Sequence, residues 1–290
     1  MAHAPAATQV HHAQGHAQEG VSADPNSHSY TATGLNSRKL LMWTFLASDV
    51  MFFGSLISAF LIYRNQSLVG PYPNEIIDVP ITSISTFVLL MSSLAMVLAL
   101  YYIKGGNAKV GRFWIVTTAF LGSVFLSFQV FEFNEFVHHG LTPKTNLFGT
   151  TFFTLTGFHG AHVTFGVAWL LVTALVATPG KRERMGLLLS VIGFYAGAVG
   201  ALGTFFDSIP VLEGAPGLIL FLVGVAVLLL GLFNLLTSKK DEKVTLGGLD
   251  LELAGLYWHF VDIVWIVIFT VVYLIAASDG PAVAAGAAAH

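Results

Sequence analysis

Seven polar residues, six of which could take part in acid–base or metal chemistry, lie inside long apolar stretches of the sequence. The stretches read FLASDVMFFG, LSFQVFEFNEF, TGFHGAHVTFG and LYWHFVDIVW. An ionisable side chain is costly in hydrocarbon, so inside a membrane-spanning segment it normally faces protein or a water-filled path and is a candidate for function. The candidates are Asp49, Gln129, Glu132, His159, His162, His259 and Asp262.

Six of these residues form pairs spaced three apart, which places both members of a pair on one face of a helix. Gln129 and Glu132 either line a proton or ion path or bind neighbouring helices through hydrogen bonds, and we favour the second interpretation. His259 and Asp262 can bond either to each other or to a polar residue of a packed helix. Asp49 stands alone, about nine residues or ~14 Å past the cytoplasmic end of its segment. It is either a functional acid or a neutral carboxyl that holds two helices together.

The histidines raise the question of a metal or haem site. His159 and His162 do not form an HExxH motif, and two histidines three apart on one helix cannot bind both faces of a haem. His259 is expected near the cytoplasmic side, at a different depth, so we expect no metal or haem here and Glu132 as a partner of His159. With no cysteine in the chain, disulfides, thiolate-bound metal centres and CxxCH haem attachment are excluded.

The composition is that of a polytopic helical membrane protein. Hydrophobic residues make up 55% of the 290 and charged residues only 10%, with a mean hydropathy of +0.74, whereas soluble domains carry roughly 25% charged residues. Seven apolar segments each approach the ~20 residues that span a bilayer. They cover about 40–63, 82–103, 113–135, 149–177, 186–206, 216–237 and 255–277.

Positive charge predicts the orientation of these segments, because Lys and Arg gather on the cytoplasmic side. With seven spans, eleven of the 13 Lys and Arg residues fall on one side, and only Arg64 and Lys144 fall on the other. The N terminus is therefore expected in the cytoplasm and the C terminus outside.

The rest of the chain divides by composition. The N-terminal tail, residues 1–37, contains HHAQGH, and its His11, His12 and His16 could bind metal weakly. The same tail shows no cleavable signal peptide, so the first apolar segment is expected to act as signal and anchor. We divide the sequence into a flexible His/Ala-rich tail (1–37), helices one to four (38–185), a further pair of spans (186–237), a cytoplasmic loop and last helix (238–278) and a flexible tail (279–290).

The four quoted stretches together resemble subunit III of the haem–copper respiratory oxidases, the cytochrome c oxidases and their quinol-oxidising relatives. They occur in the family's order, and the resemblance covers about 40–177 and 255–277, with TGFHGAHV and YWHFVDIVW the most specific. Asp49 falls where the family carries a buried, carbodiimide-reactive carboxylate, usually Glu. The first two helices of the family's seven-helix form are missing, and 186–237 is additional and expected to face lipid or an unusual partner.

The resemblance implies a non-catalytic core subunit of a proton-pumping terminal oxidase in a bacterial-type inner membrane. It implies packing on subunit I, association with subunit II and possibly further respiratory subunits, bound phospholipid, and support of proton uptake and turnover stability. Haem and copper are expected in the partner subunits. Alternatives are an accessory subunit of nitric oxide reductase, an independent proton-coupled transporter using Asp49 and Glu132, and a haem-binding cytochrome. The net charge of −3 offers no surface for nucleic acid.

Overall fold

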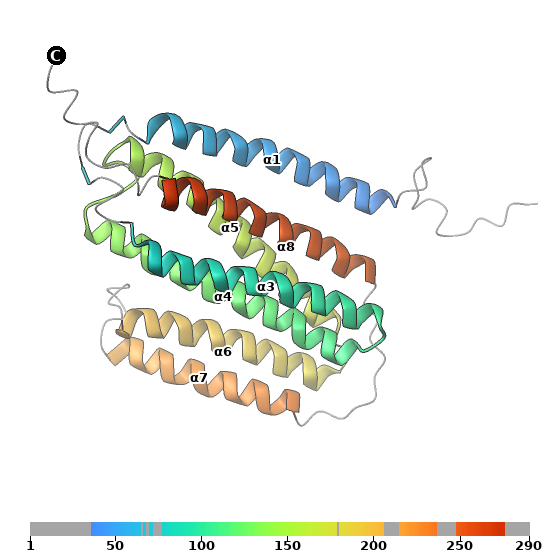
Figure 1. Ribbon diagram of the computed structural model, residues 1–290. Coiled ribbons are helices and arrows are strands. Elements are labelled where there is room, and N and C mark those ends of the chain that lie inside the picture. Colours follow the sequence, from blue (N-terminus) through green and yellow to red (C-terminus); the bar gives the residue numbers. More distant parts are fainter. Residues whose placement is uncertain are drawn as a thin grey trace, which may run out of the picture. The chain divides into compact units, whose positions relative to one another are not determined.

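The computed structural model describes residues 36–64, 66–67, 70–71, 77–178, 180–205, 215–236 and 248–275, and these residues contain seven α-helices. The all-helical prediction is confirmed, and each apolar segment coincides with one helix. The two tails predicted at the chain ends lie almost entirely outside the described residues. The helices are α1 (Ser37–Tyr63), α3 (Val79–Lys104), α4 (Ala108–His138), α5 (Leu147–Val176), α6 (Lys181–Phe205), α7 (Ala215–Leu236) and α8 (Gly248–Ile268), and α8 continues as the π-helix η3 (Phe269–Ile275) (Figure 1).

Five of these helices are long and apolar enough to cross a membrane: α1, α3, α4, α5, and α8 together with η3. The chain is therefore a multi-pass membrane protein by length and composition. The count of seven spans and the orientation of the termini stay predictions.

Local sequence explains where three of the helices begin. Asp78, Asn107 and Asn146 precede α3, α4 and α5, and each side chain accepts a hydrogen bond from a backbone N–H in the first turn. Such capping satisfies donors that have no partner within the helix. Gly106 and Gly140, just past the ends of α3 and α4, have φ of 80° and 83°, a backbone conformation that glycine adopts without strain.

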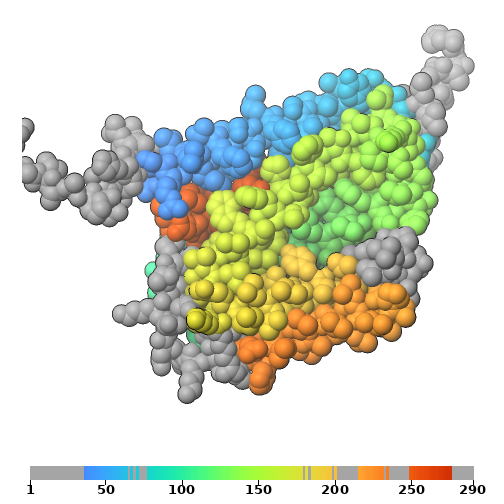
Figure 2. All heavy atoms as spheres, turned by 180° about the vertical axis from the view of Figure 1, so that it is seen from behind, coloured from blue at the N-terminus to red at the C-terminus, as the bar shows by residue number. Residues whose placement is uncertain are grey.

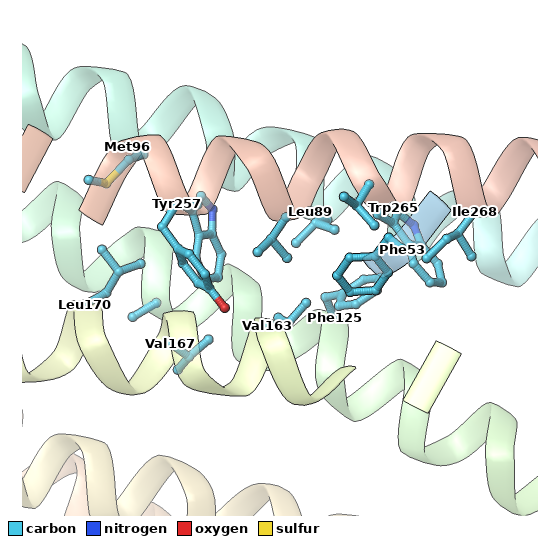
Figure 3. Packing of buried hydrophobic residues seen from close by; sticks show 14 of the residues in the cluster. Phe53, Leu89, Met96, Phe125, Val163, Val167, Leu170, Tyr257, Trp265 and Ile268 are labelled. Atoms are coloured by element: carbon cyan, nitrogen blue, oxygen red, sulfur yellow. The ribbon is translucent and has the colours of Figure 1, made fainter. Parts of the chain in front are cut away.

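The core lies between Met42 and the end of the chain, where α3 and α5 both pack against α8 and α4 packs against α3 and α5. Figure 3 shows side chains of α8 and α5 filling the space between these helices, with Tyr257 above Val167 and Trp265 beside Phe53 and Phe125.

Trp258, also buried on α8, lies between the backbones of two other helices. A Cβ built at Gly122 of α4 would come within 2.4 Å of its ring, and one at Gly166 of α5 within 2.9 Å. Two glycines thus create the space for this indole.

Helices α6 and α7 form a tightly packed pair (Figures 1 and 2). A Cβ at Gly193 would lie 2.2 Å from the backbone nitrogen of Leu228, and one at Gly224 would lie 2.2 Å from that of Gly197. Small residues of this kind allow helix backbones to approach closely in membranes. The pair contacts α4 through a 2.7 Å hydrogen bond between the hydroxyls of Ser123 and Tyr195 and through neighbouring phenylalanine rings.

Candidate functional site

Asp49 and His162 face each other between α1 and α5. The Oδ2 atom of Asp49 lies 3.8 Å from Nε2 of His162, and both side chains are largely buried. Nδ1 of His162 is 2.8 Å from the carbonyl of Phe158. Because a carbonyl only accepts, Nδ1 must carry a proton, and Nε2 faces the carboxyl. The attraction between the two groups therefore requires one further proton, held on Nε2 or on the carboxyl.

The same pair is tied to α8 by Tyr257. Its hydroxyl donates a hydrogen bond of 3.0 Å to the backbone carbonyl of His162, and its ring contacts Phe45 of α1 and Phe165 of α5. Phe53 lies edge-on to the imidazole of His162 at 4.9 Å between ring centres. The acid that the sequence left alone on α1 thus has a protein partner, as an acid in an apolar segment requires.

Glu132 is held by two hydroxyl groups from two other helices. Its Oε1 is 2.9 Å from the hydroxyl of Thr82 on α3, and its Oε2 accepts a 3.0 Å hydrogen bond from Tyr273 on η3. The Thr82 hydroxyl is also 3.0 Å from the carbonyl of Asp78. The Thr82 hydroxyl has one proton, which it shares between Oε1 of Glu132 and the carbonyl of Asp78.

Gln129, one turn before Glu132, joins α4 to α5. Its Nε2 donates a 2.8 Å hydrogen bond to the carbonyl of Thr156, and a Cβ at Gly160 would meet its Oε1 at 2.7 Å. Gly160, which has no side chain, therefore leaves the space that the amide of Gln129 occupies. Glu135, by contrast, is exposed and lies 3.5 Å from Nδ1 of His139 at the helix end.

His159 is fully buried in the core and does not meet Glu132. Its ring stacks on Trp265 at 4.8 Å, and its Nε2 is 3.3 Å from the carbonyl of Val261. The expected partnership with Glu132 is not formed, since both oxygens of Glu132 are taken by Thr82 and Tyr273. Three residues along a helix turn the side chain by about 60° from the starting direction, and this is enough for His159 to face α8 while His162 faces α1.

His259 and Asp262 lie where α8 packs on α3. Nδ1 of His259 is 2.5 Å from the hydroxyl of Ser93. Asp262 is 3% exposed, and the Ser93 hydroxyl is close enough to interact with its carboxyl, although neither oxygen forms a well-aligned hydrogen bond among the described residues. Of the two arrangements expected for this pair, His259 adopts the one with a polar residue of a packed helix.

Sequence reasoning missed the hydroxyl partners, which are concentrated on α3. Ser92 accepts from the indole N–H of Trp258, and Thr86 accepts from that of Trp265, both at 2.9 Å. The available signal was the Ser and Thr residues that recur through ITSISTFVLLMSS at helical spacing. In the described part of the chain, no three His, Asp or Glu side chains gather as metal ligands would.

Comparison with known proteins identifies the family of the chain. The sequence model of the family described as "Cytochrome c oxidase subunit III" matches residues 19–179 and 197–277, which contain all seven candidate residues. Residues 180–196 are unmatched, so the match includes much of the pair of spans predicted to be additional.

Individual relatives have the same subunit names. The chain is 30% identical to cytochrome c oxidase subunit 3 of Bacillus sp. (strain PS3), over 89% of this chain and 97% of the relative. It is 32% identical to cytochrome c oxidase subunit 3 of Bacillus subtilis, over 80% of this chain and 83% of the relative. It is 28% identical to the quinol oxidase subunit 3 of Bacillus subtilis, over 89% of this chain and 96% of the relative. The quoted motifs, the helical fold and these matches together place the chain in the cytochrome c oxidase subunit III family.

Proposed function

We propose that this chain is a non-catalytic core subunit of a proton-pumping haem–copper terminal oxidase in aerobic respiration. The observation that carries the proposal is the family match, which spans most of the chain and includes all seven candidate residues. The relatives are named as subunits of cytochrome c oxidase and of quinol oxidase. The electron donor of the complex is accordingly cytochrome c or a quinol.

The contacts of the polar residues favour a structural role for this chain over a role as a site of electron transfer. Glu132, Gln129 and His159 each contact other helices of the same chain. In a membrane protein such bonds fix the rotation and depth of helices, each with a modest gain of about 1 kcal/mol. In the proposed complex, haem and copper belong to the partner subunits, and this chain packs on subunit I, with subunit II and phospholipid nearby.

Asp49 and His162 are the residues we assign to proton uptake and turnover stability. They form the acid–base pair at the edge of the described bundle, with side chains 13% and 21% exposed, whereas His159 is wholly enclosed. A pair that shares one proton can take up and release it, provided water or a partner reaches the edge of the pair. We further propose seven spans in a bacterial-type inner membrane, with the N terminus cytoplasmic.

Affinity purification of the tagged chain from mild detergent tests the proposal. We expect the oxidase subunits to co-purify, with haem absorption that belongs to the complex and disappears when the chain is separated from it. A chain that purifies alone and transports protons in vesicles would favour the carrier alternative. A Soret band that stays with the isolated chain would contradict the assignment of haem to partner subunits.

A further inference from the structure

Helix α1, which carries Asp49, is attached to the bundle through a single stripe of side chains. Its backbone stays farther from its neighbours than the backbones of the other described helices do. The buried residues of the stripe follow one another at intervals of three, four or seven positions: Met42, Leu46, Asp49, Phe53 and Phe60. Such spacing keeps one face of a helix against its partners, so the position of Asp49 depends on the few side chains that meet this stripe.

Tyr257 of α8 contacts both of the helices that carry the Asp49–His162 pair. Its hydroxyl donates the 3.0 Å hydrogen bond to the carbonyl of His162 on α5, and Figure 3 shows this hydroxyl pointing from α8 toward α5. Its ring stacks on Phe45 of α1, one turn before Asp49, with 6.3 Å between the ring centres. The phenol is also near enough to Asp49 to interact with the charge of its carboxylate. One buried side chain therefore contacts α5 at His162 and α1 beside Asp49.

The hydrogen bond from Tyr257 is compatible with an intact α5. In an α-helix the carbonyl of His162 accepts from the amide of Gly166, one turn further on, and the second lone pair of the carbonyl oxygen stays available for Tyr257. Gly166 also makes room for the ring, since a Cβ there would lie 3.2 Å from Cε1 of Tyr257. The turn that carries His162 is therefore held to α8 without the loss of a helical hydrogen bond.

Resting on the proposed function, we propose that Tyr257 is a positioning residue for the Asp49–His162 pair. It fixes the turn of α5 that carries His162 and supports α1 beside Asp49, so that the imidazole and the carboxyl stay close enough to share a proton. Tyr257 does not itself carry that proton, because its own hydroxyl proton is used in the bond to the backbone carbonyl.

The rate at which dicyclohexylcarbodiimide modifies Asp49 in the purified full-length protein, followed by mass spectrometry at neutral pH, tests this role. The reagent attacks protonated carboxyls in apolar sites, and a carboxyl held against an imidazole is less available to it. Tyr257→Phe keeps the ring contacts and removes only the hydroxyl. We expect Asp49 in this variant to be modified about fivefold faster, the factor that corresponds to one hydrogen bond of ~1 kcal/mol.

Tyr273→Phe is the matched control for the modification rate. It removes another buried tyrosine hydroxyl from the continuation of the same helix, where the hydroxyl is bonded to Glu132 and not to the turn of His162. We expect Asp49 to be modified at the unaltered rate in this variant. An equal increase in both variants would mean that general loosening of the bundle causes the effect, and it would overturn the positioning role.

A double variant shows whether Tyr257 acts through His162. In a His162→Leu background, Tyr257→Phe should change the modification rate by less than about twofold, because the imidazole that it positions is gone. The same fivefold increase with and without His162 would overturn the positioning role. Where His162→Leu fails to fold, the comparison of Tyr257→Phe with Tyr273→Phe still decides the question.

Failure of this inference can be distinguished from failure of the proposed function. Unchanged modification of Asp49 in Tyr257→Phe overturns the positioning role and leaves the proposed function standing. If the modification rate rises as expected while the assembled complex keeps its activity through turnover, the positioning role stands, and the assignment of the pair to proton uptake and turnover stability fails. Modification of Asp49 requires only the folded chain, so it decides the role of Tyr257 even if no oxidase subunit co-purifies.

Discussion

Each buried acid in the described part of the chain has different polar neighbours. Asp49 faces an imidazole, Glu132 is held by two hydroxyls, and Asp262 lies beside the hydroxyl of Ser93. The glycines of α5 also differ in the space around them. On α5, a Cβ at Gly157 would meet nothing within 4 Å, whereas Gly160 borders Gln129 and Gly166 borders Trp258. Residues of one type on one helix therefore have different consequences.

The glycines of α5 give a first prediction. Gly166→Ala should lower the stability of the chain by about 1–3 kcal/mol, because the new methyl group overlaps the ring of Trp258 in a packed core. Gly157→Ala should be neutral or slightly stabilising, since alanine favours a helix and the space is open. Thermal unfolding of the purified protein in detergent measures both. Equal midpoints for the two variants would show that Trp258 can move aside.

The hydroxyl clamp on Glu132 gives a second prediction. Tyr273→Phe should destabilise the chain by about 1–3 kcal/mol, because Oε2 of a buried carboxyl loses its donor. Tyr101→Phe is the matched control, since Tyr101 is 70% exposed on α3. The same unfolding assay compares them. If Tyr273→Phe behaves like the control, the hydrogen bond to Glu132 contributes nothing to stability.

At the scale of the element, glycine decides how α6 and α7 pair and a π-helix decides where α8 ends. The seven residues of η3 widen the last part of α8 and place Tyr273 at Glu132. Insertions of this kind occur in helices at functional sites. The α6–α7 pair depends instead on close contact between the two backbones, at Gly193 and at Gly224. The pair contacts α4 through the hydrogen bond between Ser123 and Tyr195.

A third prediction concerns the α6–α7 pair. Gly224→Leu should separate the two helices, because even its Cβ would lie 2.2 Å from the backbone of Gly197. We expect faster hydrogen exchange in α6 and α7 and unchanged exchange in α8, measured by mass spectrometry. Ala226→Leu is the matched control, since Ala226 is exposed on the same helix. We expect hydrogen exchange in α8 to be equal in the two variants and exchange in α6 to be faster only in Gly224→Leu. Faster exchange in α8 of Gly224→Leu as well would mean that the α6–α7 pair is part of the core.

At the scale of the whole molecule, the packing joins segments that are far apart in the sequence. α8 lies against α3 and α5, and its Trp258 and Trp265 reach α3 over more than 160 residues of chain. The last helix is therefore needed to complete a bundle that begins near Met42.

A fourth prediction tests the role of the Asp49–His162 pair in the proposed complex. Asp49→Ala should assemble with normal stoichiometry but lose activity faster during turnover, or take up protons more slowly at high pH, because His162 no longer faces an acid that can share a proton. Asp49→Glu, which keeps a carboxyl opposite His162, should behave like the unaltered chain. Oxygen consumption followed over many turnovers measures the effect. Unchanged kinetics and lifetime in Asp49→Ala would reduce Asp49 to a packing residue.

The sequence by itself determined the helices and the residues worth examining. Apolar length locates every described helix, because it depends only on neighbours in the chain, but α4, α6 and α8 begin five to seven residues before the predicted segments. The same reasoning selected the seven polar residues, since a costly residue in an apolar segment is informative wherever it occurs.

The tertiary structure alone decided which of these residues meet. Asp49 and His162 are 113 residues apart, and nothing in either segment specifies the other. The partners of Glu132 are hydroxyls of Thr82 and Tyr273, which are too common in membrane helices to be singled out, and the π-helix that presents Tyr273 has no signal in FTVVYLI. Contacts between helices depend on their rotation and crossing, which arise from the packing of all side chains together and not from any one segment.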